Sequence, residues 1–399
     1  MLKKVLKGLG IFLLVTIIAL AAAPFLFKDK IKEMIAKTLN ENVNANIAFE
    51  DVDLSLFKSF PQAHVTIDKL SIINKAPFAG DTLLYAGETN VTMSVKELFK
   101  GEGETMSLES FNAVDGILNI IFNKDGVGNF DIALKEAEEK KPSESKPFSL
   151  DIQKYGVENL KFSYIDEGSN MKMVLDSIYH EGKGNFAAQK LDLDTKTSAK
   201  LSFEMEKMNY LNNVGITLDA VLGIDLDQSK YTFKENKALI NQLPLEFDGF
   251  IQLVESGQLY DLKFKTPTSS FQNFLGLIPT AYAGSLKDVK TTGDFTVVGF
   301  AKGLYSDKTV PKFNIAIASN NASFKYVSLP KSVQNIVIDT KIINETGVLN
   351  DTYVNLDKLS FKIDQDVFNA KANIRNITKN PLVNAELKGT INLGNVSKA

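Results

Sequence analysis

The residues of this chain best suited to acid–base chemistry are its two histidines, His64 and His180. An imidazole titrates near neutral pH and serves as a catalytic base when a nucleophile and an orienting group stand beside it. No motif in the sequence pairs either histidine with such a nucleophile. We therefore interpret His64 as a structural residue within a strand and His180 as a structural residue within a polar turn.

Four pairs of aspartates at alternate positions are the next candidates, because alternate residues of a strand point to the same side. Two carboxylates on one face could bind a metal ion or share acid–base work. None of the pairs has the glycine and glutamate of a calcium-binding loop, and a solvated polar face accounts for all of them. The pairs are Asp51/Asp53, Asp192/Asp194, Asp225/Asp227 and Asp364/Asp366. We predict no metal site.

Sequence motifs of common enzymes are missing. The chain has no G-x-S-x-G, no Walker A and no H-E-x-x-H motif. Residues 182–187, Gly-Lys-Gly-Asn-Phe-Ala, formally match G-x-G-x-x-A, but a dinucleotide site needs a following helix and residues 189–193 alternate like a strand. We predict no catalytic residue and no cofactor, and hence a protein that is not an enzyme.

The elements that position everything else begin with an uncharged run of twenty residues, 8–27. A helix of this length reaches about 30 Å, the thickness of a bilayer's hydrocarbon core. Twelve of the residues are Leu, Ile, Val or Phe, so insertion is favoured by roughly 4 to 7 kcal/mol. The core of the run contains Leu9, Ile11, Phe12, Leu13, Leu14, Val15, Ile17, Ile18 and Leu20. We predict a transmembrane anchor over residues 1–27.

A cleavable signal peptide is the alternative interpretation of this run. Three lysines lie within the first seven residues, and alanines 21–23 resemble a cleavage site. Pro24 would follow that cut, which is unfavourable, and the run extends past the usual length of a signal peptide's apolar core. Lysines flank the run almost equally on both sides. Because the other orientation would leave the large following domain in the cytoplasm with no role for its anchor, we expect a cytoplasmic N-terminus.

Composition narrows the remaining possibilities. The chain has 399 residues, a formal net charge of −3, no Cys, no Trp and 27 Phe. No basic cluster suggests nucleic acid as a partner. The absence of Cys excludes disulfides and thiolate metal sites, and it is compatible with a bacterial periplasm.

Residues 28–134 are expected to form an α+β domain. Apolar residues at three- and four-residue steps continue a helix over 28–40, which either lies on the membrane surface or caps the following sheet; its mixed charges favour the cap. From residue 47 the period becomes two, which predicts strands up to residue 122, the last of them split near Asp115-Gly116. Asn123-Lys124-Asp125-Gly126 predicts a tight turn.

This region resembles the N-terminal region of the AsmA family of bacterial envelope proteins. The resemblance is carried by LSLFKSFPQAHVTIDKLSIIN and by VTMSVKELFKGEGETMSLESFNAVDGILNIIFNKDGVGNFDI. A short leucine-containing helix precedes a Gly-Lys-like corner, and an Asp-Gly turn leads to asparagine and an aromatic residue. Those places are Leu98-Phe99, Lys100-Gly101, Asp125-Gly126 and Asn129-Phe130. The family commonly has Trp where Phe130 stands, which is a mild departure.

The resemblance implies a function as well as a fold. It implies a membrane-anchored, non-enzymatic envelope protein of Gram-negative bacteria that supports phospholipid transport between the inner and outer membranes and outer-membrane assembly. A similarity to bridge-like lipid transfer proteins points the same way. Two later passages, DLKFKTPTSSFQNFLGLIPTAY and LPKSVQNIVIDTKI, also resemble AsmA-like proteins.

Residues 135–147 form a charged linker, since eight of these thirteen residues are charged and two are proline. Residues 148–399 then predict an elongated, twisted antiparallel sheet. Its alternating segments are 160–165, 191–193, 201–205, 216–226, 245–253, 259–264, 295–300, 313–317, 336–342, 359–363 and 385–393. One amphipathic helix near 270–279 interrupts them, with a capping box from Ser269 to Gln272 and Pro279 at its end. The fold class is therefore mainly β with few short helices.

The apolar face of this sheet is the candidate binding site. In residues 216–226, Ile216, Leu218, Ala220, Leu222, Ile224 and Leu226 share one face, with Asp219 and Asp225 on the other. One short helix cannot cover such a face. Either the sheet closes on itself as a sandwich or barrel, which is the commoner solution and would suit a periplasmic scaffold or binding protein, or it curls into a trough for phospholipid acyl chains, which the resemblance favours. In a trough, Ile216, Leu218, Leu222, Ile224 and Leu226 are the lipid-contacting residues.

Retention of the anchor is testable on the intact protein. Protease added to spheroplasts should digest everything after residue 27, because the body is expected in the periplasm. N-terminal sequencing should find Met1 or Leu2. A mature chain that starts near Pro24 would contradict the anchor.

Overall fold

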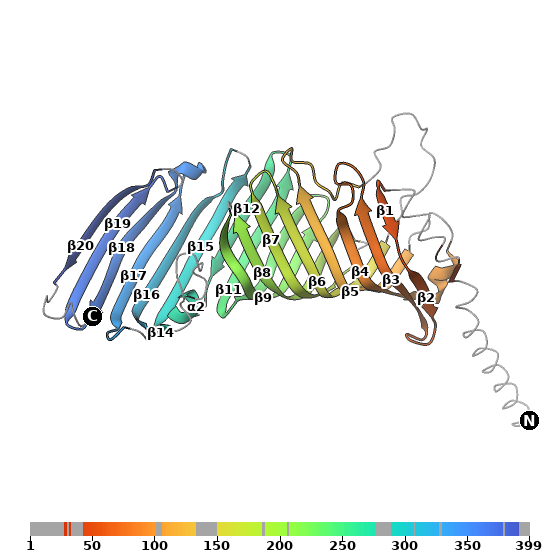
Figure 1. Cartoon of the computed structure of the whole chain (residues 1–399), viewed down its shortest axis with the longest axis horizontal. Coiled ribbons are helices and arrows are strands. Elements are labelled where there is room, and N and C mark those ends of the chain that lie inside the picture. Colours follow the sequence, from red (N-terminus) through yellow and green to blue (C-terminus); the bar gives the residue numbers. More distant parts are fainter. Residues whose placement is uncertain are drawn as a thin grey trace, which may run out of the picture. The chain divides into compact units, whose positions relative to one another are not determined.

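The computed structural model describes residues 28–29, 32, 43–100, 106–132, 150–185, 188–205, 207–267, 269–275, 289–306, 308–326, 329–377 and 380–390. The fold is mainly β, a twisted mixed sheet with very few helices (Figure 1). The chain divides into two compact units. Unit 1 comprises Met1–Ala188 and Thr197–Lys207, and unit 2 comprises Gln189–Lys196 and Met208–Ala399.

Unit 1 is built on a central antiparallel group in which β3, β4 and β5 pair in sequence order. Two short strands, β1 and β2, both pair with β3. The elements are β1 (Ala45–Ala48), β2 (Asp51–Ser55), β3 (Gln62–Asn74), β4 (Thr82–Ser94), the 3₁₀ helix η1 (Val95–Phe99), β5 (Met106–Phe122), β6 (Leu150–Asp166) and β7 (Met171–Lys183). The next strand, β8 (Lys190–Met205), runs through the boundary of the two units.

Two sequence predictions for this unit are wrong in detail. The sheet is not purely antiparallel, because β5 and β6 pair in parallel, from Met106↔Leu150 to Phe122↔Asp166. A parallel pair needs a long return connection, and residues 123–149 lie between these strands. The expected break at Asp115-Gly116 is a bend within one continuous strand, β5, where Asp115 has a φ of 53°. The linker predicted at 135–147 lies outside the described residues.

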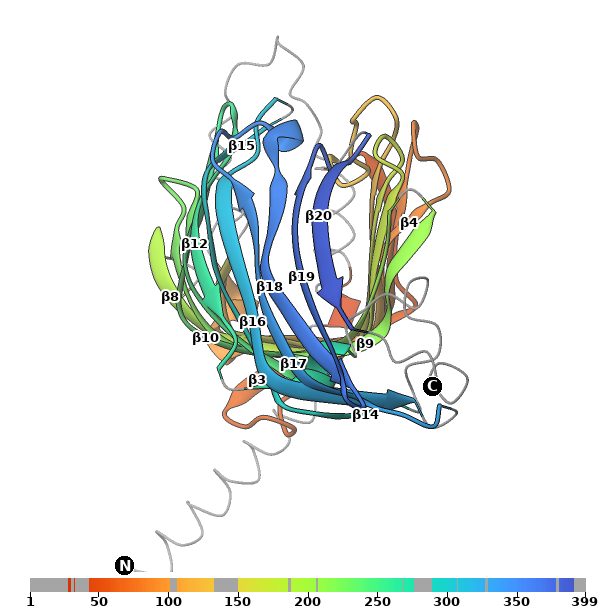
Figure 2. The ribbon, with the colours of Figure 1, turned by 90° about the vertical axis from the view of Figure 1, so that its left-hand side faces the viewer.

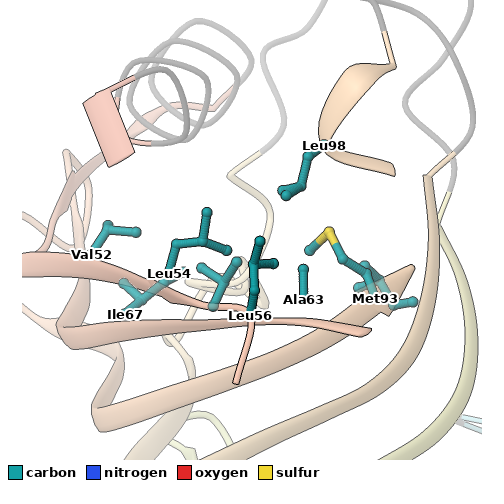
Figure 3. Packing of buried hydrophobic residues seen from close by; sticks show 9 residues of the cluster. Val52, Leu54, Leu56, Ala63, Ile67, Met93 and Leu98 are labelled. Carbon is teal, nitrogen blue, oxygen red and sulfur yellow. The ribbon is translucent and has the colours of Figure 1, made fainter. Parts of the chain in front are cut away.

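The main core of unit 1 lies on one face of β2 to β5. Val52, Leu54, Leu56, Ala63, Val65, Ile67, Met93, Leu98 and Leu108 form one buried cluster. Leu98 of η1 reaches down to the side chains of the sheet (Figure 3). Each large apolar side chain buried in this way contributes roughly 1.5–3 kcal/mol. The short helix expected around Leu98-Phe99 therefore exists, as a 3₁₀ turn that covers the sheet.

A row of left-handed residues bends the strands of unit 1. Lys69 in β3, Asp115 in β5, Asn159 in β6 and Ser177 in β7 have φ values of 52°, 53°, 53° and 51°. These four residues are left out of the pairing. Between β6 and β7 the register also shifts there, as it does at a β-bulge, which bends a strand and increases its twist. Because neighbouring strands bend at neighbouring positions, the sheet curves without losing its pairing.

Unit 2 is an antiparallel meander. Strands β9 to β12 pair in sequence order, β12 pairs with β15, and β15 to β20 again pair in sequence order. Its strands are β9 (Met208–Asp225), β10 (Lys230–Ile240), β11 (Leu243–Val254), β12 (Gly257–Lys265), β13 (Ser269–Ser270), β14 (Val289–Thr292), β15 (Asp294–Tyr305), β16 (Lys312–Tyr326), β17 (Val333–Asn344), β18 (Tyr353–Ile363), β19 (Asp366–Arg375) and β20 (Leu382–Gly389). The helices are α2 (Phe271–Leu275) and the 3₁₀ helix η3 (Leu349–Asp351).

The alternating segments identified in the sequence lie in strands as far as they are described, with corrected bounds. Segments 191–193 and 201–205 belong to the single strand β8, and the last described strand ends at Gly389; residues 391–393 lie outside the described residues. The helix expected near 270–279 begins at Phe271, and Ser270 Oγ, not Ser269, accepts the hydrogen bond of a helix amide, from Asn273 N at 3.3 Å. Residues 276–279 lie outside the described residues.

Asn129 closes the turn that follows β5. The tight turn predicted at Asn123–Gly126 is confirmed, with Gly126 N donating to Asn123 O at 3.0 Å. Beyond it Asn129, only 2 % exposed, donates to Asn119 O at 2.9 Å and to Asn74 Oδ1 at 3.3 Å, and accepts from Ile121 N at 2.9 Å. One side chain thus provides hydrogen-bond partners for polar groups of both β3 and β5.

Replacing Asn129 with Ala should therefore destabilise unit 1. The change removes three buried hydrogen bonds and leaves their partners unsatisfied, so we expect a loss of about 2–4 kcal/mol in the free energy of unfolding. Urea denaturation followed by circular dichroism measures this loss. Asn112→Ala is the matched control, since Asn112 makes one long bond to Glu158 at 3.4 Å; an equal loss in both variants would contradict the role of Asn129.

Candidate functional site: an apolar sheet face

The apolar side of β9 continues onto β10, because directly paired residues of antiparallel strands point to the same side. Leu218 pairs with Ala238, Leu222 with Phe233, and Ile224 with Tyr231. The predicted residues Ile216, Leu218, Leu222 and Ile224 therefore lie on one face of β9 and meet apolar neighbours on β10. Leu226 lies beyond β9 in the following turn and is 48 % exposed, so it is not a strand residue as expected.

The same face stays apolar across the rest of unit 2. On each successive strand, a member of this face either pairs directly with a member on the neighbouring strand or lies on the same side of its strand as a residue that does. We define the apolar face as Ile216, Leu218, Leu222, Ile224, Tyr231, Phe233, Leu245, Phe247, Ile251, Leu253, Tyr260, Leu262, Phe264, Val297, Tyr305, Phe313, Ile315, Ile317, Ile338, Ile342, Val354, Leu356, Leu359, Phe361, Phe368, Ile374, Val383 and Leu387. Ten paired strands at about 4.8 Å spacing give this face a length of roughly 43 Å.

Ring contacts support the assignment of these side chains to one side. The rings of Phe233 and Phe247 meet edge to face at 5.3 Å, and those of Phe361 and Phe368 stack at 5.0 Å. Each pair joins two adjacent strands. Such contacts add about 0.5–1.5 kcal/mol beyond the area that they bury, so they also hold the strands in register.

The opposite face of unit 2 carries charges that pair across strands. Glu246 and Lys265 approach to 3.2 Å, Asp261 and Lys302 to 2.7 Å, and Lys341 and Asp357 to 3.4 Å. These are solvent-exposed pairs, each worth about 0–1 kcal/mol. The two faces therefore differ in chemistry: one, the ionic face, is mainly charged and polar, and the other is mainly apolar.

Within the described residues of unit 2, a second layer covers only one part of the apolar face. There α2 packs Phe271 against Phe295, and Leu243, Ala322 and Ile336 complete a buried cluster. Elsewhere the large apolar side chains are half-buried or exposed, with Leu253 at 47 %, Tyr305 at 50 % and Leu387 at 68 %. Strands β16 to β20 lie side by side as a single layer (Figures 1 and 2).

Two hollows in the described residues lie mainly among side chains of the ionic face. One, of about 840 Å³, is lined by Val298 and Phe300 together with charged residues such as Lys265. The other, of about 540 Å³, contains three lysines, two of which are held by Asp192 and Asp225. In the first hollow Glu246 and Lys265 form an ion pair, and its three acidic and three basic side chains balance in number.

Both histidines lie in strands, and both ring nitrogens of each lie within hydrogen-bonding distance of a polar side-chain atom. His64 in β3 contacts Thr92 Oγ1 at 3.3 Å and Asn90 Oδ1 at 3.1 Å. His180 lies in β7 and not in a polar turn as expected; its Nε2 meets Tyr155 Oη at 2.7 Å and its Nδ1 meets Thr197 Oγ1 at 2.8 Å. Burial lowers the pKa of His180 and raises the pKa of Tyr155. The sequence does not reveal that β7 pairs with β6, with His180 opposite Val157. This pairing brings His180 beside Tyr155.

The aspartate pairs do not converge on a metal site. In three of the pairs, one carboxylate forms ion pairs with lysine: Asp51 with Lys28 and Lys32, Asp192 with Lys234, and Asp225 with Lys190. In the fourth, Lys331 holds Asp364 at 2.7 Å. Asp227 and Asp364 lie in turns, so the last two pairs do not share a strand face as expected. No cluster of three metal-ligating side chains occurs among the described residues.

The glycine-rich segment and the anchor complete the list of predicted sites. Gly182 and Lys183 end β7, and the next described element after this segment is the strand β8, as the alternation predicted. None of the described helices is long and apolar enough to cross a membrane. The run 8–27 lies outside the described residues, so the anchor stays a prediction.

Comparison with known proteins adds no assignment. No family model, no curated protein and no solved structure matches the chain at a significant level.

The environment of His180 predicts a pH dependence of stability. Burial lowers its pKa in the folded protein, so between the folded and unfolded pKa values the unfolded chain binds more protons. The stability contributed by neutral His180 is then fully present above about pH 6.5, the ordinary imidazole pKa, and declines as the pH falls below it. Urea midpoints at pH 5.5 and 7.5 should differ less in His180→Gln than in the natural protein. An unchanged difference in His180→Gln would contradict the prediction, and His64→Gln is the matched control.

Proposed function

We propose that this chain is a membrane-anchored, non-enzymatic protein of the bacterial envelope that holds phospholipid acyl chains on the apolar face of unit 2. The observation that carries the proposal is that face: ten strands present hydrocarbon on one side, and a described second layer covers it only at α2. Exposed apolar patches beyond a few hundred Å² are rare on soluble monomers and mark binding surfaces.

The chemistry of the face suits an acyl chain better than a polar ligand. It offers no cluster of charged groups to fix a headgroup, while its aliphatic and aromatic side chains match hydrocarbon in polarity. At roughly 0.8 kcal/mol per buried CH₂, a long acyl chain gains on the order of 10 kcal/mol before ordering costs. An acyl chain can bind at any position along a continuous apolar face. A protein that carries lipids needs binding of this kind.

The wider cellular role draws on two sequence features. The uncharged run 8–27 has the length of a membrane span, which would hold the body at the inner membrane. The AsmA resemblance suggests movement of phospholipid between the inner and outer membranes and support of outer-membrane assembly. The alternative function is a periplasmic scaffold, in which other proteins and not lipids cover the apolar face.

Site-specific photo-crosslinking distinguishes these functions. A photoreactive residue at Leu222 or Ile224 should capture phospholipid in cells, because both side chains lie on the apolar face. The same residue at Asp219, which pairs with Lys237 on the ionic face of the same strand, is the matched control and should not. Thin-layer chromatography and mass spectrometry of the purified adduct identify the lipid.

Three outcomes would oppose lipid binding. Equal labelling at positions 222 and 219, or no lipid adduct with a folded protein, would remove the support for an acyl-chain surface. Protein adducts confined to positions 222 and 224 would favour the scaffold.

A further inference from the structure

Three phenylalanines are exposed at one end of unit 1. Phe57 and Phe60 lie in the loop between β2 and β3 and are 56 % and 65 % exposed, and Phe99 at the end of η1 is 65 % exposed. The loop and η1 are neighbours, because Gln62 after the loop pairs with Ser94, and the Ser94 side chain caps η1. Their buried residues Leu56 and Leu98 belong to the same cluster (Figure 3).

Two lysines, unpaired among the described residues, lie beside these rings. Lys58 lies between Phe57 and Phe60, and Lys96 lies in η1; both are exposed. Glu97 is the acidic residue within segments 56–62 and 94–100, and Glu102 and Glu104 follow in the sequence, outside the described residues. The Glu97 carboxylate is buried, pairs with Lys100 at 2.6 Å and accepts a hydrogen bond from Ser107 N at 2.9 Å. Exposed aromatic rings beside unpaired cationic side chains are typical of surfaces that meet the headgroup region of an anionic bilayer.

Two lysines that follow the uncharged run in the sequence, Lys28 and Lys32, are bound to strand β2. Lys28 Nζ contacts Asp51 Oδ2 at 2.8 Å and Asp53 Oδ1 at 2.9 Å, and Lys32 Nζ contacts Asp51 Oδ1 at 2.5 Å. These ammonium groups hold the pKa of the Asp51 carboxyl well below its usual range. Lys28 directly follows the uncharged run 8–27.

Strand β2 connects the two features. It carries Asp51 and Asp53 and leads directly into the loop with Phe57 and Phe60. At about 3.3 Å per residue, Phe57 lies roughly 13 Å along the chain from Asp53. Lys28, which follows the apolar run in the sequence, and the exposed rings are thus joined through the same short strand.

We propose that Phe57, Lys58, Phe60, Lys96 and Phe99 form an interfacial patch that rests on the anionic phospholipid bilayer into which the run 8–27 inserts. The patch would fix unit 1 against the membrane at a second point, so that the body cannot turn freely about its anchor. The inference rests on the membrane anchorage in the proposed function and is independent of acyl-chain binding by unit 2.

The absence of Trp from the chain makes the patch directly testable. The full-length variants Phe57→Trp, Phe60→Trp and Phe99→Trp are each reconstituted into vesicles of phosphatidylcholine and phosphatidylglycerol with brominated acyl chains. Each Trp should lose most of its emission relative to vesicles without bromine and should shift to shorter wavelength. Tyr179→Trp is the matched control: Tyr179 is 55 % exposed on β7, outside the patch, and a Trp there should be unquenched.

A second comparison tests the charges. In the Phe60→Trp background, Lys58→Glu combined with Lys96→Glu should reduce quenching when phosphatidylglycerol is present. Unchanged quenching in this variant would overturn the role of the lysines.

The remaining outcomes separate this inference from the proposed function. Absence of quenching at all three patch positions in protein that floats with the vesicles, or equal quenching at position 179, would overturn the patch and leave lipid binding by unit 2 intact. Protection of the three Trp residues from acrylamide without lipid would mean that a second copy covers the patch, which also overturns it. Protein that does not float with vesicles would contradict both the patch and the anchor.

Discussion

Alternation of side chains along a strand, kept in step by cross-strand hydrogen bonds, is the constraint on which this structure depends. A slip of one residue in any pair would move the apolar side chains of a strand to the opposite face. The apolar side chains stay on one face of unit 2 from β9 to β20, even though the strand pairing contains bulges. Between β17 and β18, for example, Thr340 pairs with Leu356 and Asp339 with Lys358, so Asp357 is the extra residue and Leu359 returns to the apolar side.

The ionic face supports this register in a different way. Exposed ion pairs contribute little to stability, but like charges placed opposite each other are unfavourable. Pairs such as Asp261–Lys302 and Glu246–Lys265 therefore disfavour slipped alternatives more than they strengthen the observed one. They also keep water on that side of the sheet, which leaves the apolar face as the side suited to hydrocarbon.

Unit 1 uses the same alternation for another purpose. There the apolar side of β2 to β5 is closed by η1 into a conventional core, and the strands bend at left-handed residues such as Asp115 and Asn159. Asn159 donates to Asp115 Oδ1 at 2.7 Å across β5 and β6, so a side-chain bond joins two of these bends. A compact core beside the proposed membrane contact suits a unit that must hold its orientation.

The sequence by itself determined which residues alternate along the strands and where the turn after β5 occurs. The face shared by Ile216, Leu218, Leu222 and Ile224, the turn at Asn123–Gly126 and the strand that follows the glycine-rich segment were all readable, because they depend on local periodicity and on turn residues. The tertiary structure decided what depends on partners distant in the chain. The parallel pairing of β5 with β6, the bonding of His180 to Tyr155 and Thr197, and the hold of Lys28 on Asp51 each join residues from different elements. Whether an apolar face is covered is also a property of neighbouring elements, since alternation looks the same in a closed sandwich and in a single layer.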